Sequence, residues 1–124
     1  MKKFFEFSLP LADNTLMTTV RLTVGGLAAL AGMDVDEGED YKVCVTESLL
    51  LFKRNGFSSA RAHFEITEEG IDSVLFAEGE GERTAEAELE DEISYALLGA
   101  LVDEVNFERR GNGRVAKVEL KKTV

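Results

Sequence analysis

The chain has 124 residues, of which 44% are hydrophobic and 31% are charged, a length and composition typical of one domain with a single core. Its 14 basic and 24 acidic residues give a net charge of -10 at pH 7, which argues against a general binder of nucleic acid or anionic membranes because both would repel it. No apolar run approaches the roughly 18 residues of a membrane span. The only cysteine, Cys44, cannot form an intramolecular disulfide, so we expect a cytoplasmic protein with a buried, inert thiol.

The first part of the chain predicts a strand and a helix. Apolar and polar side chains alternate over residues 5–9 and stop at Pro10, which is typical of a strand with one buried face. Apolar residues at helical spacing follow, with a polar cap at residues 13–14 and an end at Gly32. Two glycines at 25–26 weaken the middle of this helix, so we expect close packing or a kink there.

A second helix and a hairpin come next. The helix begins in the acidic turn 34–40 and continues to about Asn55, and its broad apolar stripe predicts a central position. Residues 60–66 alternate in polarity, and the apolar run 71–77 follows a glycine-containing turn, which predicts a strand hairpin. His63 is expected on a strand face, where a catalytic or metal role has little support.

The segment 78–92 contains eight acidic residues and one basic residue. We expect a solvated loop that leads into a helix, since acidic residues in a first turn suit the helix dipole, and the run lacks the glycine-pinned pattern of a calcium loop. Leu89, Ile93, Leu97 and Leu101 recur at helical spacing and predict the apolar stripe of that helix.

The last elements predicted are strands over 105–107 and 116–120. The order is therefore βααββαββ within a single domain, residues 1–124. We expect an α/β (α+β) two-layer sandwich in which the helices cover one face of a mixed sheet.

Short motifs spread over nearly the whole chain resemble one known family. They are Phe7-Ser8-Leu9-Pro10, Val20-Arg21-Leu22, Val45-Thr46-Glu47, Gly79-x-Gly81 and Leu101-Val102-Asp103-Glu104-Val105. Together they resemble the anti-sigma-factor serine kinases of the histidine-kinase-like (GHKL) ATPase superfamily. The resemblance implies the histidine-kinase-like ATPase fold, and it implies a nucleotide site whose residues can be compared one by one.

The resemblance places a general base at Glu47 and, four residues later, an asparagine that binds the Mg²⁺ of ATP. Here that position is Leu51, which has no oxygen to offer a hard cation. Glu47 alone is a weak catalytic candidate. The family's adenine-binding Asp-x-Gly-x-Gly motif keeps its glycines, Gly79 and Gly81, but its carboxylate is replaced by Ala77, which cannot accept the hydrogen bond from adenine.

Two further departures fall on the implied phosphate and base sites. The glycines that the family uses to hold phosphate correspond to Glu92 and Ser94, and a carboxylate there repels a triphosphate. The threonine that opens the last strand corresponds to Arg114. If each of the four departures cost about 1 to 2 kcal/mol, the affinity for ATP would fall by about three to five decades.

The sequence therefore favours an anti-sigma-factor-like, protein-binding regulator that has lost Mg-ATP binding and kinase activity, with no cofactor and no metal site. The resemblance implies a sigma factor or an anti-sigma-factor antagonist as the protein partner, and a homodimer formed through residues 4–30, with no nucleic-acid or membrane partner. The alternative is an active ATP-dependent serine/threonine kinase of such an antagonist, with Mg-ATP as cofactor and Glu47 as base.

Overall fold

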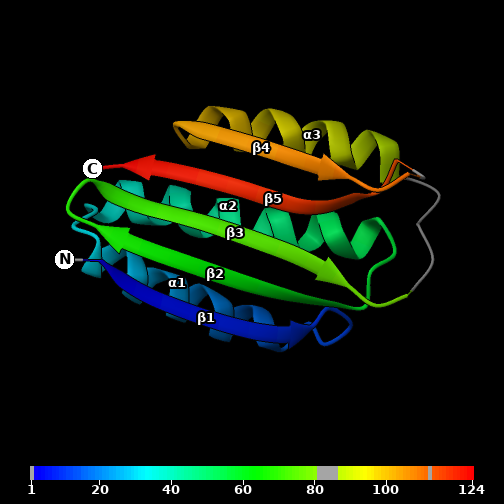
Figure 1. The fold of residues 1–124 in the computed structure, drawn as a ribbon, viewed down its shortest axis with the longest axis horizontal. Helices are drawn as coiled ribbons and strands as arrows, with labels where there is room; N and C mark the ends of the chain where they lie inside the picture. The colour runs from blue at the N-terminus through cyan, green and yellow to red at the C-terminus, as the bar shows by residue number, and fades with distance from the viewer. Residues whose placement is uncertain (1, 81–86, 112) are drawn as a thin grey trace.

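The computed structural model describes residues 2–80, 87–111 and 113–124, with the backbone alone at residue 87. These residues form five strands and three helices in the order βααββαββ, which confirms the predicted order (Figure 1). The elements are β1 (Lys3–Pro10), α1 (Leu16–Leu30), α2 (Val35–Arg54), β2 (Ser59–Thr67), β3 (Gly70–Glu78), α3 (Ala87–Leu101), β4 (Glu104–Arg109) and β5 (Val115–Thr123).

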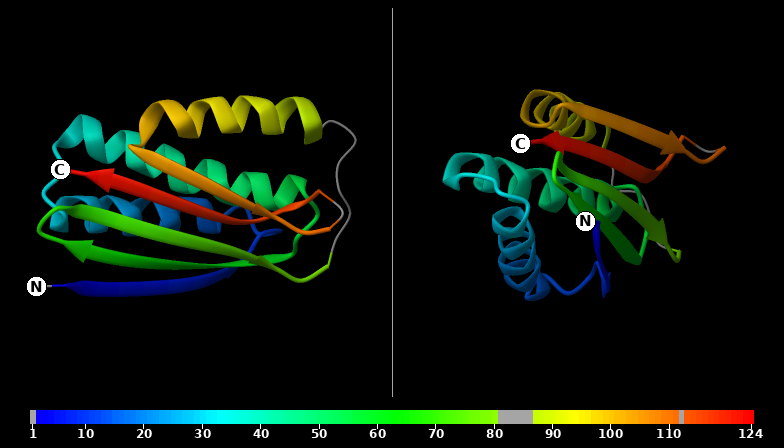
Figure 2. Two further views of the ribbon diagram at one scale, coloured as in Figure 1. Left: turned by 45° about the horizontal axis from the view of Figure 1, so that its top comes forward. Right: turned by 60° about the vertical axis from the view of Figure 1, so that its left-hand side comes forward.

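The strands of the described residues form one sheet in the order β1-β2-β3-β5-β4. All four neighbouring pairs are antiparallel, so the predicted mixed sheet is wrong. The connection through α3 does make β3 and β4 run in the same direction, but β5 lies between them and pairs with both. The helices pack together on one face of this sheet (Figure 2), which confirms the two-layer, α+β arrangement.

α2 is the central helix, as its broad apolar stripe predicts. Its start is fixed by a capping box in which the Asp34 carboxylate accepts the Glu37 N–H at 2.8 Å and the Glu37 carboxylate accepts the Asp34 N–H at 3.2 Å. Tyr41 is fully buried and its hydroxyl bonds that of Ser73 on β3. Cys44 is also fully buried, and this burial raises the pKa of its thiol to about 12, in keeping with the inert role expected for it.

α1 begins later than the sequence predicts. Asp13 does not cap it; the Asp13 carboxylate instead accepts the backbone N–H of Thr15 at 3.0 Å and its hydroxyl at 2.5 Å, which lowers the pKa of Asp13. The helix then runs unbroken through its two glycines. A Cβ at Gly25 would lie 2.7 Å from Lys42 Cε, so the close packing expected there is present, whereas the same atom at Gly26 would meet nothing within 4 Å in the described part of the chain.

The opposite face of the sheet carries many charged side chains, which pair across the strands, together with a few apolar ones such as the exposed Phe4. Arg61 binds Glu78 at 2.7 Å, and His63 Nδ1 lies 3.0 Å from the Glu6 carboxylate, so His63 is on a strand face as expected. No helix within the described ranges is long and apolar enough to cross a membrane.

Candidate functional site

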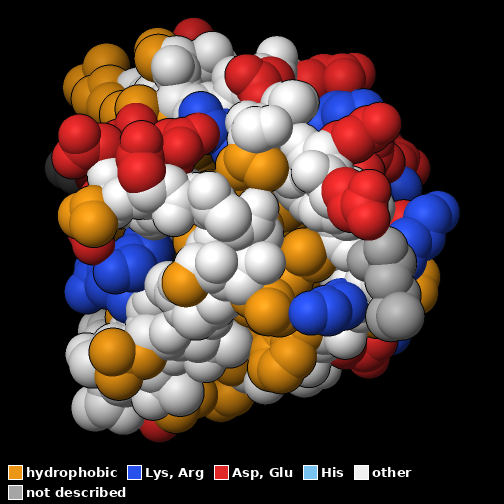
Figure 3. All heavy atoms as spheres, turned by 90° about the vertical axis from the view of Figure 1, so that its left-hand side faces the viewer, with side chains coloured by type: hydrophobic (Ala, Val, Ile, Leu, Met, Phe, Trp, Pro, Cys, Tyr) orange, Lys and Arg blue, Asp and Glu red, His pale blue; other side chains and the backbone are white. Residues whose placement is uncertain are grey.

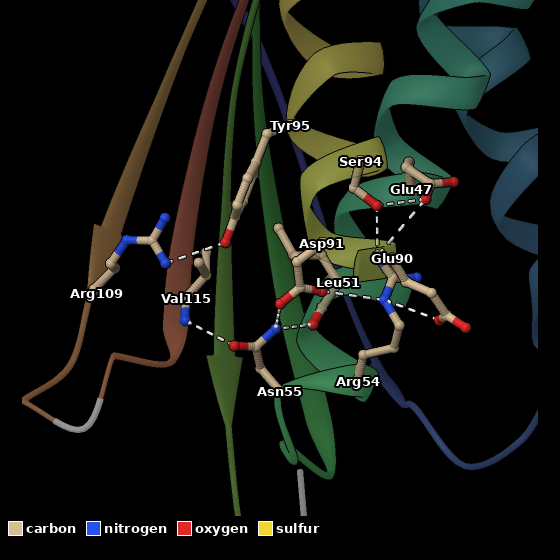
Figure 4. A network of polar contacts seen from close by, with 10 residues as sticks. All are labelled: Glu47, Leu51, Arg54, Asn55, Glu90, Asp91, Ser94, Tyr95, Arg109 and Val115. Carbon is tan, nitrogen blue, oxygen red and sulfur yellow. Dashed lines mark hydrogen bonds and ion pairs between the residues drawn. The ribbon is translucent and has the colours of Figure 1, made fainter. Parts of the chain in front are cut away.

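Two of the residues that the resemblance places at the nucleotide site meet between α2 and α3. Ser94 of α3 donates its hydroxyl to Glu47 Oε1 of α2 at 2.6 Å, and Arg54 Nη2 donates to the same Ser94 oxygen at 2.5 Å (Figure 4). Arg54 also lies 3.7 Å from Glu47 Oε1. The candidate base is therefore held by a hydroxyl and a guanidinium from its own chain.

The same arginine reaches further acidic residues at the start of α3. Arg54 Nε lies 3.1 Å from Asp91 Oδ1 and 3.4 Å from Glu90 Oε2. Three carboxylates, counting that of Glu47, thus lie within 4 Å of one guanidinium. Because the Arg54 side chain is only 13% exposed and that of Asp91 only 3%, little water screens these charges, and the attraction is stronger than at an open surface.

Asn55 links this cluster to the sheet. Its amide nitrogen donates to Asp91 Oδ2 at 2.9 Å and to the Leu51 carbonyl at 2.8 Å, and its amide oxygen accepts the Val115 N–H at 3.2 Å (Figure 4). Asn55 is fully buried, so each of these bonds satisfies a group that water does not reach. We call Glu47, Arg54, Asn55, Asp91 and Ser94 the α2–α3 polar cluster.

The expected stripe of α3 is wrong at its first two residues, whereas Leu97 and Leu101 are half-buried and Leu101 packs against the core. Asp91, Ser94 and Leu98 point into the molecule, whereas Leu89 and Ile93 are 73% and 61% exposed. The expectation that the acidic run is solvated therefore fails at Asp91. The pairing of Asp91 with Arg54 was missed because it joins residues 37 positions apart; the one available signal was that 91, 94 and 98 share a helix face.

The other expected site residues do not gather in one pocket. Leu51 and Ala77 are buried in the core, and Glu92 is exposed on α3, so Glu92 does not join them. Gly79 has φ +82° in the turn after β3. The Arg114 guanidinium lies 5.9 Å over the Phe57 ring. Gly81, like the acidic residues 82 and 86, falls outside the described residues.

These side chains do not fit the Mg-ATP that the resemblance implies. Leu51 has no oxygen and is closed into the core, while Glu47 and Ser94 bind each other and Arg54. Among residues 2–80, 87–111 and 113–124, no group of three or more His, Cys, Asp or Glu side chains has the arrangement of a metal site. The hydrogen bonds and ion pairs of the α2–α3 polar cluster instead have a structural role, since they hold α2, α3 and β5 together.

Comparison of the sequence with protein-family models and with curated proteins finds no match to either. The family resemblance is therefore a prediction that rests on the motifs quoted above.

Proposed function

We propose that this chain is a protein-binding regulator of the anti-sigma-factor type that acts without Mg-ATP. The observation that carries the proposal is the outward face of α1. This helix has one charged residue, Arg21, in 15 positions, although 31% of the whole chain is charged. Leu22 and Leu30 are 73% and 53% exposed on it. A helix whose outward face carries a single charge, that of Arg21, is typical of an element that another protein covers.

The neighbouring edge of the sheet adds to this surface. Among the described residues β1 pairs only with β2, so its other edge is open to a further strand. A shallow groove between β1 and α1 has an apolar floor that includes Leu9 and Val20. Acidic side chains are sparse in the lower half of Figure 3, where α1 and β1 lie.

This surface suits both partners implied by the resemblance. In a chain with a net charge of -10, the face of α1, which has no acidic residue, is where two copies approach with least repulsion. This supports a homodimer through residues 4–30. The same face would serve a sigma factor or an anti-sigma-factor antagonist. The chain would then regulate its partner by binding alone, without phosphorylating it.

The test combines self-association with nucleotide binding. We expect Leu22→Asp to shift the chain from dimer to monomer in sedimentation velocity and to weaken its binding to the sigma factor or antagonist of its source organism. Thr67→Asp, which adds the same charge at the end of β2 and keeps an acceptor for the Glu69 N–H, should change neither. A wild-type chain that is monomeric and binds none of these proteins would refute the proposal. Saturable calorimetric binding of Mg-ATP that chelation abolishes would favour the kinase alternative.

A further inference from the structure

α3 turns polar residues inward and apolar residues outward. Its buried face carries Asp91 and Ser94 beside Leu98, while the opposite face carries Leu89 and Ile93 with the exposed Ala96 and Ala100. These four outward residues have the spacing i, i+4, i+7 and i+11, which forms one continuous stripe along a helix. We call them the α3 stripe. A stripe of this kind, opposite the buried face, is typical of a helix that is covered on both sides.

The rotation of α3 that exposes the stripe is fixed from two directions. On one side the α2–α3 polar cluster holds Asp91 and Ser94 against α2. On the other side the Tyr95 ring packs edge-on against Phe107 of β4 at 4.8 Å between centroids, and its hydroxyl accepts from Arg109 at 3.1 Å. Turning the stripe inward would break both sets of contacts, so its exposure is built into the fold.

The borders of the stripe are acidic. α3 contains four acidic residues and no Lys or Arg. Glu88 and Glu92 are exposed along one border, and Glu90 lies along the other, toward α2. A partner that complements this surface would carry an apolar strip with positive charges on both sides of it.

We propose that the α3 stripe docks a basic amphipathic helix of another protein, with apolar residues on one face flanked by Lys and Arg. A second copy of this chain is the poorer occupant, because pairing two stripes would bring both sets of glutamates together. An anionic membrane is repelled for the same reason. α1 and α3 lie on opposite sides of α2 (Figure 2), so this proposal is independent of the one made for α1.

The probe is a fluorescein-labelled synthetic helix of leucine and lysine with its leucines on one face, followed by fluorescence anisotropy. A peptide in which glutamate replaces every lysine is the control. The substitutions Leu89→Gln and Ile93→Gln keep good helix formers while removing apolar contact. We expect each to weaken binding of the lysine peptide about tenfold or more, and Glu88→Gln/Glu92→Gln to weaken it and to reduce its dependence on salt.

The matched control is Leu22→Gln on α1, since Leu22 is as exposed as Leu89 but lies across α2 from the stripe. It should leave peptide binding unchanged, and peptide-induced shifts in the amide spectrum of the ¹⁵N-labelled chain should fall on residues 88–101. Three results would overturn the proposal: equal loss of binding in the α1 and α3 variants, equal binding of the glutamate peptide, or a dimer that Ile93→Gln dissociates.

Discussion

Replacing Arg54 with methionine tests whether the α2–α3 polar cluster holds the helices together. Methionine keeps the helix propensity and much of the apolar stem of arginine but removes the guanidinium. Asp91 then stays buried without that cation, and Ser94 loses a donor. We expect the free energy of unfolding to fall.

The size of the effect follows from burial. Removing one partner of a buried ion pair costs about 3 to 5 kcal/mol, and we take the low end because Arg54 keeps 13% exposure. The lost bond to Ser94 adds about 1 kcal/mol. A loss of about 3 to 4 kcal/mol is a large share of the stability of a domain of this size. With a slope of about 2 kcal/mol per molar urea, the midpoint should fall by roughly 1.5 to 2 M.

Far-UV circular dichroism during urea unfolding is the suitable assay, because the chain has no tryptophan. Lys53→Met is the matched control, since Lys53 precedes Arg54 and its side chain makes an exposed bond to Asn14 at 2.8 Å; it should cost less than about 1 kcal/mol. The double variant Arg54→Met/Asp91→Leu removes both charges and should show a coupling energy above about 1 kcal/mol. Equal effects of Arg54→Met and Lys53→Met, with no coupling, would refute the reasoning.

Three other predictions use simpler measurements. Tyr41→Phe should cost about 1 to 3 kcal/mol in urea unfolding because the buried Ser73 hydroxyl loses its partner, and a cost near zero would contradict that bond. Between about pH 9 and pH 12 the folded chain keeps the Cys44 proton that the unfolded chain has lost, so stability should fall as pH rises, less steeply in Cys44→Ala; parallel curves for the two would argue against the raised pKa. Gly26→Ala should raise the melting temperature by several degrees, since the added methyl meets only open space; a lower melting temperature would mean that α1 needs this glycine.

The sequence was sufficient for the elements whose signals are local. The alternation over 5–9 and 60–66, the turn glycine at position 70 and the acidic residues at the start of α2 are signals from neighbouring residues, and all of the elements that they predict are present. The capping box between Asp34 and Glu37 shows why, since both of its bonds lie within three residues.

The face of α3 that is buried could not be predicted in the same way. Four apolar residues at helical spacing favoured Leu89 and Ile93 as the buried stripe, but hydrophobicity alone cannot report that Arg54 lies opposite Asp91. An ion pair between distant residues stabilised the rotation that apolar periodicity disfavours. The candidate site was therefore half predicted: Glu47 and Ser94 meet, but the arginine that joins them was missed.

The strand order has a consequence for how this chain is made. β5 follows every other element in the sequence, yet it lies between β3 and β4 in the sheet. During synthesis β4 has no neighbour to pair with until β5 has emerged, and β3 has only β2. The nascent chain therefore exposes two strand edges at once, a state prone to aggregation. Closure of the sheet by β5, and the bond from Val115 to Asn55, must wait until residues 115–123 have been synthesised, so folding of this domain is expected to complete only after β5 has emerged from the ribosome.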